Sequence, residues 1–194
     1  MTTLAITSSQ TVGPFFADGL LREDMRYNRL AGPETEGVHI RIEGHIFDGD
    51  GAPVPDALVE IWQADGQGRY RQLDAASVPE PPEFIGFGRS GTDESGLFWF
   101  ETVKPGPVPL DLDHPEIMQA PHISVIIFAR GLLNHLVTRL YFANEPANLT
   151  DPILQRVPAE RRATLLARPQ SGAGELYHHD IILQGAGETA FFNL

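Results

Sequence analysis

The sequence predicts a mainly β fold: an antiparallel or mixed β-sandwich with an N-terminal arm and a short helical excursion. Three observations support this prediction. Short segments of alternating apolar and polar residues recur along the chain, Gly (19) and Pro (16) separate them, and helix signals are confined to few places. With 194 residues, 42% of them hydrophobic, the chain can bury a substantial core. We expect one domain over 1–194, with residues 1–37 as the arm and 38–194 as the β-sandwich core.

The elements follow in chain order. The arm is rich in Thr, Ser, Gly and Pro, and we expect one short helix in it, over Leu20–Tyr27. The first strand is expected at Val38–Ile42, where Val and Ile alternate with polar residues. Turn residues separate it from the later expected strands, which are Ala57–Trp62, Leu97–Val103, Ile123–Phe128, Leu136–Phe142 and Asp180–Gln184.

The helical excursion is expected over Asp151–Val157 and Pro158–Ala167. Pro152 and Pro158 supply the start signals, because proline suits the first turn of a helix. Nothing in the chain reads as an internal repeat, a low-complexity tract or a second domain.

Composition excludes several classes of function. The chain has no cysteine, so disulfides, zinc knuckles, iron–sulfur clusters and thiol catalysis are ruled out. Any metal must be held by His, Tyr and carboxylates, which favours a hard or borderline ion such as iron. A formal net charge of −12 argues against nucleic acid or an anionic membrane as a partner. An anionic ligand would therefore need a local cation.

The start of the chain, Met1–Leu4, lacks the basic and apolar segments of a secretory signal. No apolar run reaches the roughly 18 residues of a membrane span. We therefore expect a cytoplasmic protein.

The segment APHISVIIF, Ala120–Phe128, reads as a buried strand entered through a proline. Residues two apart on a strand share a face, so His122 and Ser124 point the same way. A His-x-His at this place would suggest a metal site, and here the second position is serine. The segment resembles half of a metal site.

Several segments resemble the intradiol ring-cleaving dioxygenase family. The arm (SSQTVGPFF) and the ending (IILQGAGETAFFNL) look most like the α subunits of its two-chain, protocatechuate-cleaving branch. The resemblance runs over nearly the whole chain, with its motifs in the same order. The internal segments that carry it are Val59–Tyr70, Gly88–Pro109, Ala120–Gly131 and Thr138–Phe142.

The resemblance implies a ferric site of two tyrosines and two histidines in catalytic members. Tyr70 matches the first tyrosine, but Val108 follows Lys-Pro-Gly-Pro where the second belongs. His122 matches the first histidine, Ser124 replaces the second, and Gln119 stands where the pattern has arginine. Valine has no donor atom, and a serine hydroxyl is a poor substitute for imidazole. We expect these four positions to be vestigial and free of metal.

The resemblance further implies a partner β subunit that carries the complete Fe(III) site. The pair would cleave 3,4-dihydroxybenzoate with O2 to 3-carboxy-cis,cis-muconate. Thr11, Gly13, Pro14 and Arg130 match positions that line part of the substrate pocket. A tight Gly-Pro turn exposes backbone groups, a threonine offers a hydroxyl, and an arginine can bind the substrate anion. No residue of this chain alone is expected to be catalytic.

Other readings stay open. Tyr70 can be a packed aromatic and His122 a buried histidine satisfied by neighbours, which we favour over metal binding. Arg130 can be a solvated side chain or part of an intrachain ion pair. The chain can also be a self-sufficient dioxygenase with unidentified ligands, or a non-enzymatic β-sandwich that binds small molecules. Finally, His178 and His179 are adjacent and so face opposite ways on a strand, and we interpret them as a strand start.

Overall fold

The computed structural model describes residues 8–13, 15–70, 83–170 and 175–193. Most of its regular structure is a nine-stranded mixed sheet, and a two-stranded ribbon lies beside it. The strands of the large sheet are β1 (His39–Phe47), β2 (Leu58–Trp62), β3 (Phe87–Gly91), β4 (Leu97–Val103), β7 (His122–Phe128), β8 (Leu136–Phe142), β9 (Leu166–Pro169), β10 (Leu176–His178) and β11 (Ile181–Ile182). The ribbon is β5 (Val108–Pro109) with β6 (Met118–Gln119).

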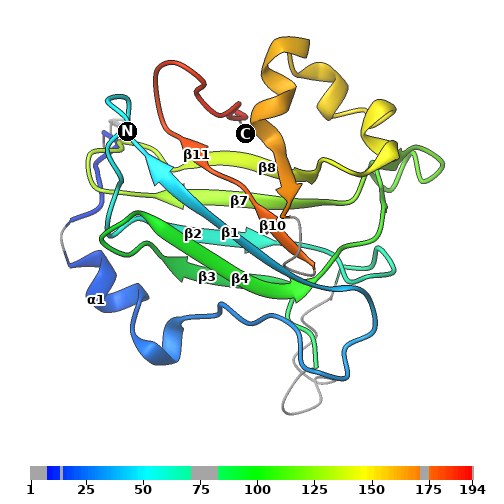
Figure 1. Ribbon diagram of the computed structural model, residues 1–194, viewed down its shortest axis with the longest axis horizontal. Helices are drawn as coiled ribbons and strands as arrows, with labels where there is room; N and C mark the ends of the chain where they lie inside the picture. Colours follow the sequence, from blue (N-terminus) through cyan, green and yellow to red (C-terminus); the bar gives the residue numbers. More distant parts are fainter. Residues whose placement is uncertain (1–7, 14, 71–82, 171–174, 194) are drawn as a thin grey trace, which may run out of the picture.

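The sheet runs in the order β11-β1-β10-β9-β8-β7-β2-β3, and β4 pairs with β1. Most pairs are antiparallel, while β1–β10, β1–β11 and β8–β9 are parallel. The sheet folds over itself, so that β1 and β4 cross in front of β2, β3 and β7 (Figure 1). The predicted mainly β, mixed architecture is confirmed. The division into a 1–37 arm and a 38–194 core, as one domain, stays a prediction.

The core lies between these two layers. Along β1 every second residue is buried, and Ile40, Ile42 and Ile46 point inward. They meet Phe100 from β4 and Ile127 from β7 in one apolar cluster. Burying a large aliphatic or aromatic side chain stabilises the fold by about 2 kcal/mol each, which fixes the strand register.

Strands β4 and β8 have the predicted bounds, whereas β3 was not predicted. Its sequence, FGRSG, has too few apolar side chains to show alternation. The glycine is nevertheless required: a Cβ on Gly88 would lie 2.8 Å from side-chain atoms of Ile61 and Leu30. Close packing between the layers therefore requires glycine at this position, and glycine removes the apolar alternation that would have indicated a strand.

The helix expected at Leu20–Tyr27 is wrong in position. The structure has a five-residue helix α1 (Phe16–Leu20) and a 3-10 turn η1 (Glu23–Met25). The chain leaves helical geometry because Tyr27 exchanges backbone hydrogen bonds with Arg89 of β3. Pairing with the sheet overrides the local helix preference.

The helical excursion is present but consists of 3-10 segments: η2 (Pro146–Leu149), η3 (Leu154–Arg156) and η4 (Ala159–Leu165). The second predicted helix ends at Leu165 instead of Ala167, because Leu166 pairs with Tyr141 of β8 and begins β9. In the described part of the chain, no helix is long and apolar enough to cross a membrane.

The His178–His179 pair does not start a strand, which corrects the prediction: His178 is the last residue of β10, and His179 follows it. The two side chains do face opposite ways: His178 is partly exposed and His179 is buried. The reason for the error is that β10 and β11 are separate short strands that pair with different parts of β1.

Candidate functional site

The four ligand positions inferred from the sequence gather where β7 begins. His122 is the first residue of β7, and Ser124 pairs with Trp62 of β2 on one side and with Arg139 of β8 on the other. Tyr70 follows β2 and stacks on Trp62, with the ring centroids 6.4 Å apart and the planes 4° from parallel.

The loop that carries Tyr70 packs on the Lys-Pro-Gly-Pro segment. The backbone N–H of Gly106 donates to the carbonyl of Asp65 at 2.9 Å. Gly68 has a φ of +78°, and a Cβ there would overlap the carbonyl oxygen of Pro107. This close approach needs glycine. Val108, buried at the end of the segment, then pairs with Gln119 through the β5–β6 ribbon.

A cation lies within this cluster. From β8, the Arg139 Nη1 donates to the Gln119 Oε1 at 2.8 Å and to the Tyr141 hydroxyl at 3.4 Å. Its charge also acts on two neighbours: it adds to the effect of burial in lowering the pKa of His122, and it opposes the effect of burial, which raises the pKa of Tyr70. Gln119 stands where the family pattern has arginine, and here Arg139 on the neighbouring strand supplies a guanidinium beside it.

The environment keeps the potential donors in their neutral forms. Burial, helped by the charge of Arg139, lowers the pKa of His122 to about 4. The His122 ring is 4% exposed, and its Nδ1 donates to the carbonyl of Ala120 at 2.8 Å. Burial raises the pKa of the Tyr70 hydroxyl, and Arg139 opposes this only in part. His122 is thus a buried, satisfied histidine, as the sequence analysis favoured.

These residues do not fit ferric iron. Fe(III) favours hard anionic oxygen donors together with imidazoles, and this cluster offers one neutral phenol, one histidine, a valine and a serine.

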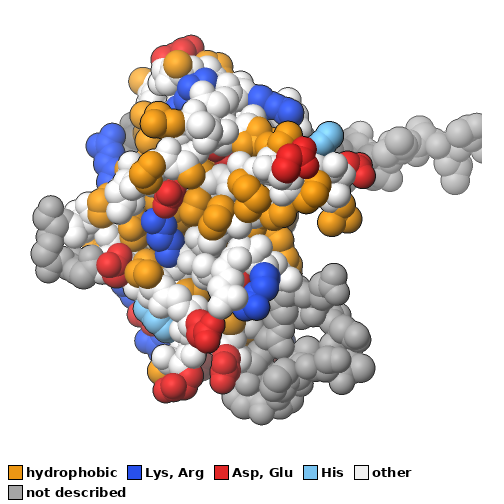
Figure 2. Space-filling view, turned by 90° about the vertical axis from the view of Figure 1, so that its right-hand side faces the viewer, with side chains coloured by type: hydrophobic (Ala, Val, Ile, Leu, Met, Phe, Trp, Pro, Cys, Tyr) orange, Lys and Arg blue, Asp and Glu red, His pale blue; other side chains and the backbone are white. Residues whose placement is uncertain are grey.

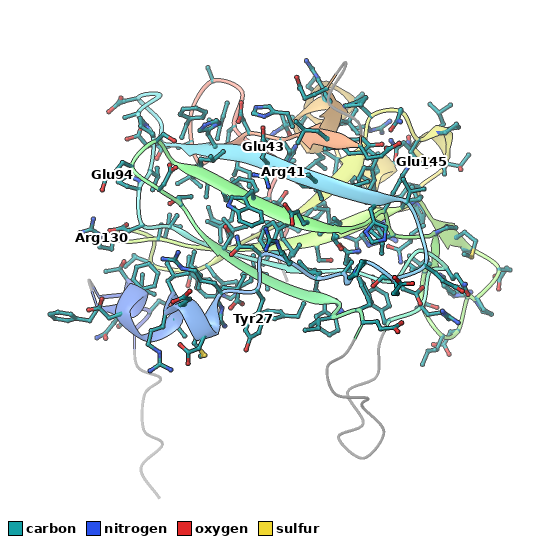
Figure 3. The ribbon with its side chains drawn as sticks, turned by 60° about the horizontal axis from the view of Figure 1, so that its bottom comes forward. Tyr27, Arg41, Glu43, Glu94, Arg130 and Glu145 are labelled. Atoms are coloured by element: carbon teal, nitrogen blue, oxygen red, sulfur yellow. The ribbon has the colours of Figure 1, made fainter. Side chains whose placement is uncertain are left out.

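The inferred pocket residues lie elsewhere, past the other end of β7. Seven strand residues separate the ends by about 20 Å. Figure 3 marks this arrangement, since Arg130 follows β7 at one end of the sheet and Glu145 follows β8 at the other. The Arg130 Nη2 is 2.6 Å from the Asp56 Oδ2, and its side chain is 55% exposed. The intrachain ion pair foreseen as an alternative for Arg130 is therefore present.

The arm reaches this end of the sheet. The backbone N–H of Gly131 donates to the Thr11 Oγ1 at 2.8 Å, which places Thr11 beside Arg130. The Gly13 carbonyl accepts from the N–H of Phe16 at 3.1 Å, in a turn that leads into α1. Pro14 lies outside the described residues. A cavity of about 320 Å³ separates part of the arm from the β7–β8 connection; its walls include Val12, Phe128 and His135.

Sequence reasoning missed two residues that shape these sites. Arg139 was hidden because its proximity to Gln119 and Ser124 depends on strand register, which one sequence does not reveal. Asp56 was hidden in a turn, where it has a φ of +56°. Aspartate tolerates this left-handed backbone better than most residues. The conformation itself is visible only in the structure.

Comparisons with known proteins indicate the family of the chain. A family model described as Dioxygenase (Dioxygenase_C) matches residues 12–185. The protocatechuate 3,4-dioxygenase alpha chain of Burkholderia cepacia is 44% identical, over 100% of both chains. The alpha chain of Pseudomonas putida is 41% identical over 96% of each. The B. cepacia beta chain is 36% identical, over 88% of this chain and 75% of that protein.

Solved structures give the same picture. The dioxygenase domain of a dioxygenase and carbohydrate-binding protein fusion from Streptomyces sp. SirexAA-E superimposes with a TM-score of 0.63 and 27% identity, covering 93% of this chain and 99% of that one. Catechol 1,2-dioxygenase from Pseudomonas arvilla C-1 gives a TM-score of 0.62 at 25% identity, over 81% of this chain and 56% of that one.

Proposed function

Because this chain belongs to the intradiol dioxygenase family, we propose that it is an α-type subunit of a protocatechuate 3,4-dioxygenase and acts with a β subunit. The pair converts 3,4-dihydroxybenzoate and O2 to 3-carboxy-cis,cis-muconate, with both oxygen atoms entering the product. The observation that carries the proposal is the ligand cluster at the start of β7, which lacks two of four ligands and holds Arg139. Similarity to alpha chains over the full length supports it.

In this proposal the chain holds no iron, and the Fe(III) belongs to the β subunit. The cluster keeps the positions of a metal site but not its set of donor atoms; these positions are Tyr70, Val108, His122 and Ser124. Arg139 supplies a fixed positive charge there, and its hydrogen bond to Gln119 links β8 to the β5–β6 ribbon. The cluster is then structural.

The contribution to the reaction comes from the other end of β7. Arg130 offers a partly exposed guanidinium, which suits the carboxylate of a dihydroxybenzoate. Asp56 orients the guanidinium through an ion pair, and the hydrogen bond between Thr11 and Gly131 holds the arm next to Arg130. Thr11, Gly13 and Pro14 would form a wall of the pocket. A local cation matters because the whole chain carries a charge of −12 and repels anions.

A hetero-oligomer also suits the surface of the chain. Figure 2 views the end of the molecule at which β7 begins, and hydrophobic side chains gather across its middle. Large apolar residues exposed in and around the β5–β6 ribbon are Leu112, Ile117 and Met118. Exposed apolar surface of this kind is typical of protein–protein contacts.

The pocket role is tested by Arg130→Ala in the assembled enzyme. We expect KM for 3,4-dihydroxybenzoate to rise about tenfold or more, since the carboxylate loses its cation, which corresponds to about 1.4 kcal/mol. Arg29→Ala is the matched control, because Arg29 is also an exposed arginine in an ion pair, 2.7 Å from Glu101. Unchanged KM and kcat in the Arg130 variant would remove this residue from the pocket.

A further inference from the structure

Three potential metal ligands meet outside both sites discussed so far. They are His45 on β1, His178 at the end of β10, and Asp180 just before β11. The His178 Nε2 lies 3.0 Å from the Asp180 Oδ1, and the His45 Nδ1 lies 3.4 Å from the same oxygen. One ligand atom from each residue lies within 4.8 Å of the other two.

We propose that His45, His178 and Asp180 form a binding site for a divalent transition metal ion of the zinc class. Two imidazoles and one carboxylate are the donor set that zinc, nickel and copper(II) accept, with bonds of about 2.0–2.2 Å. A small closing movement of the three side chains would bring their donors to these distances around one ion. Water would complete the coordination, because the three side chains are 32%, 33% and 40% exposed.

The sheet holds the three ligands in place. Parallel pairing sets His178 opposite Glu43, and the next contact of β1 in this direction joins Ile46 to Ile181. The backbone N–H of His45 donates to the Asp180 Oδ1 at 2.8 Å, which orients the carboxylate toward the histidines. Little backbone order remains to be gained on binding, and such preorganisation favours affinity.

The neighbouring His179 does not join this group. Its side chain is buried, unlike those of His178 and Asp180, although all three residues contribute to the lining of a cavity of about 220 Å³. The chelating pair is therefore His45 with His178, from two strands, and not the two adjacent histidines that the sequence displays. Because it uses neither the cluster at the start of β7 nor Arg130, this inference is independent of the proposed function.

Metal binding would fasten the C-terminal strands β10 and β11 to β1. Since the ion would bind the folded chain and not the dispersed ligands of the unfolded one, it would raise the unfolding temperature, and the stabilisation would grow with the logarithm of the ion concentration above the dissociation constant.

The test is calorimetric titration of the untagged, assembled enzyme with ZnCl2. We expect one site per chain with a dissociation constant of about 10 µM or lower. His45→Gln, His178→Gln and Asp180→Asn should each weaken that site about tenfold or more, since even supporting residues of metal sites have effects of this size. His114→Gln is the control, because His114 is exposed and lies 3.7 Å from Glu116 with no third ligand among the described residues.

A spectroscopic measurement identifies the ligands directly and does not rely on comparing the affinities of variants that fold poorly. With one equivalent of Cu2+, the electron paramagnetic resonance spectrum of the native protein should show coupling to two imidazole nitrogens, and that of the His178 variant to one. Equal zinc affinity in the native and His45→Gln proteins, or no zinc binding tighter than about 100 µM in the native protein, would overturn the inference.

Discussion

Arg139 supplies a positive charge to the cluster at the start of β7. Its guanidinium contacts Gln119 and Tyr141, and its charge reaches the two remaining ligand positions, Tyr70 and His122. Since the family pattern has an arginine at the neighbouring position 119, the missing donors at Val108 and Ser124, and not this charge, explain why the cluster does not suit Fe(III).

Rebuilding the site tests the importance of the missing donors. The double variant Val108→Tyr with Ser124→His restores four donors, and we expect it to bind iron that the native chain does not bind. Adding Arg139→Gln removes the positive charge and keeps an amide donor toward Gln119, and we expect iron binding to be retained. Iron content per chain and the phenolate-to-iron absorption band measure the outcome, with circular dichroism to check folding. Iron content as low in a folded double variant as in the native chain would contradict the view that the missing donors keep the cluster free of iron.

The buried His122 predicts a loss of stability in mild acid. Its pKa is about 4 in the folded chain and about 6.5 when unfolded, so the unfolded state binds more protons between these values. The free energy of unfolding should decrease as the pH falls from 6.5 to 4, by up to about 3 kcal/mol from this residue. Denaturant titrations at several pH values measure the slope. In His122→Asn, whose amide can still donate to Ala120, the slope should be smaller, and an unchanged slope would exclude His122 as its cause.

At the scale of the elements, Asp151 joins the helical excursion to the sheet. Its fully buried carboxylate accepts from the backbone N–H groups of Ile153 and Leu154, which begin the 3-10 turn η3. It also accepts from the backbone of Ala120, before β7, and from the Tyr141 hydroxyl on β8. One side chain thus connects three elements.

Asp151→Ala should therefore cost about 3 kcal/mol or more in unfolding free energy, because four donors lose their acceptor in a buried place. Asp111→Ala is the control: Asp111 also accepts from two backbone N–H groups, of Asp113 and His114, but it is exposed. We expect its cost to stay near 1 kcal/mol or below. Chemical denaturation of both variants compares them, and equal losses would contradict the connecting role of Asp151.

The strands also show how much of the fold can be predicted from a single sequence. Apolar alternation located β4 and β8 with correct bounds, since those strands carry enough large side chains. It missed β3, where glycine is needed for close packing, and β9 and β10, whose few residues show no period. Helical signals near Leu20 were displaced because pairing with the sheet cannot be seen locally.

The candidate sites, too, were only partly predictable from the sequence. Motif resemblance placed His122 and the other ligand positions together, and it placed Thr11 near Arg130. Arg139, Asp56 and the pair His45–His178 depend on which strands are neighbours and in which register. Partners of this kind, on different strands or loops, can be identified only once the fold is known.

For the whole molecule, the two ends of β7 differ. One end holds the incomplete ligand cluster, and the other holds the partly exposed Arg130 beside the arm, which is hydrogen-bonded there through Thr11. Under the proposed function, this separation would let a chain without a complete metal site take part in an iron-dependent reaction. The chain would lend a wall and an anion-binding group to the partner's site, while its own cluster serves the fold.

Iron analysis of the separated and assembled subunits tests this account most directly. The chain should be purified alone and together with its β partner, and iron and ring cleavage of 3,4-dihydroxybenzoate should be measured in both preparations. We predict no iron and no ring cleavage in the chain alone, and one iron per αβ pair with activity in the complex. One equivalent of iron in the isolated chain, or ring cleavage without the partner, would contradict the account.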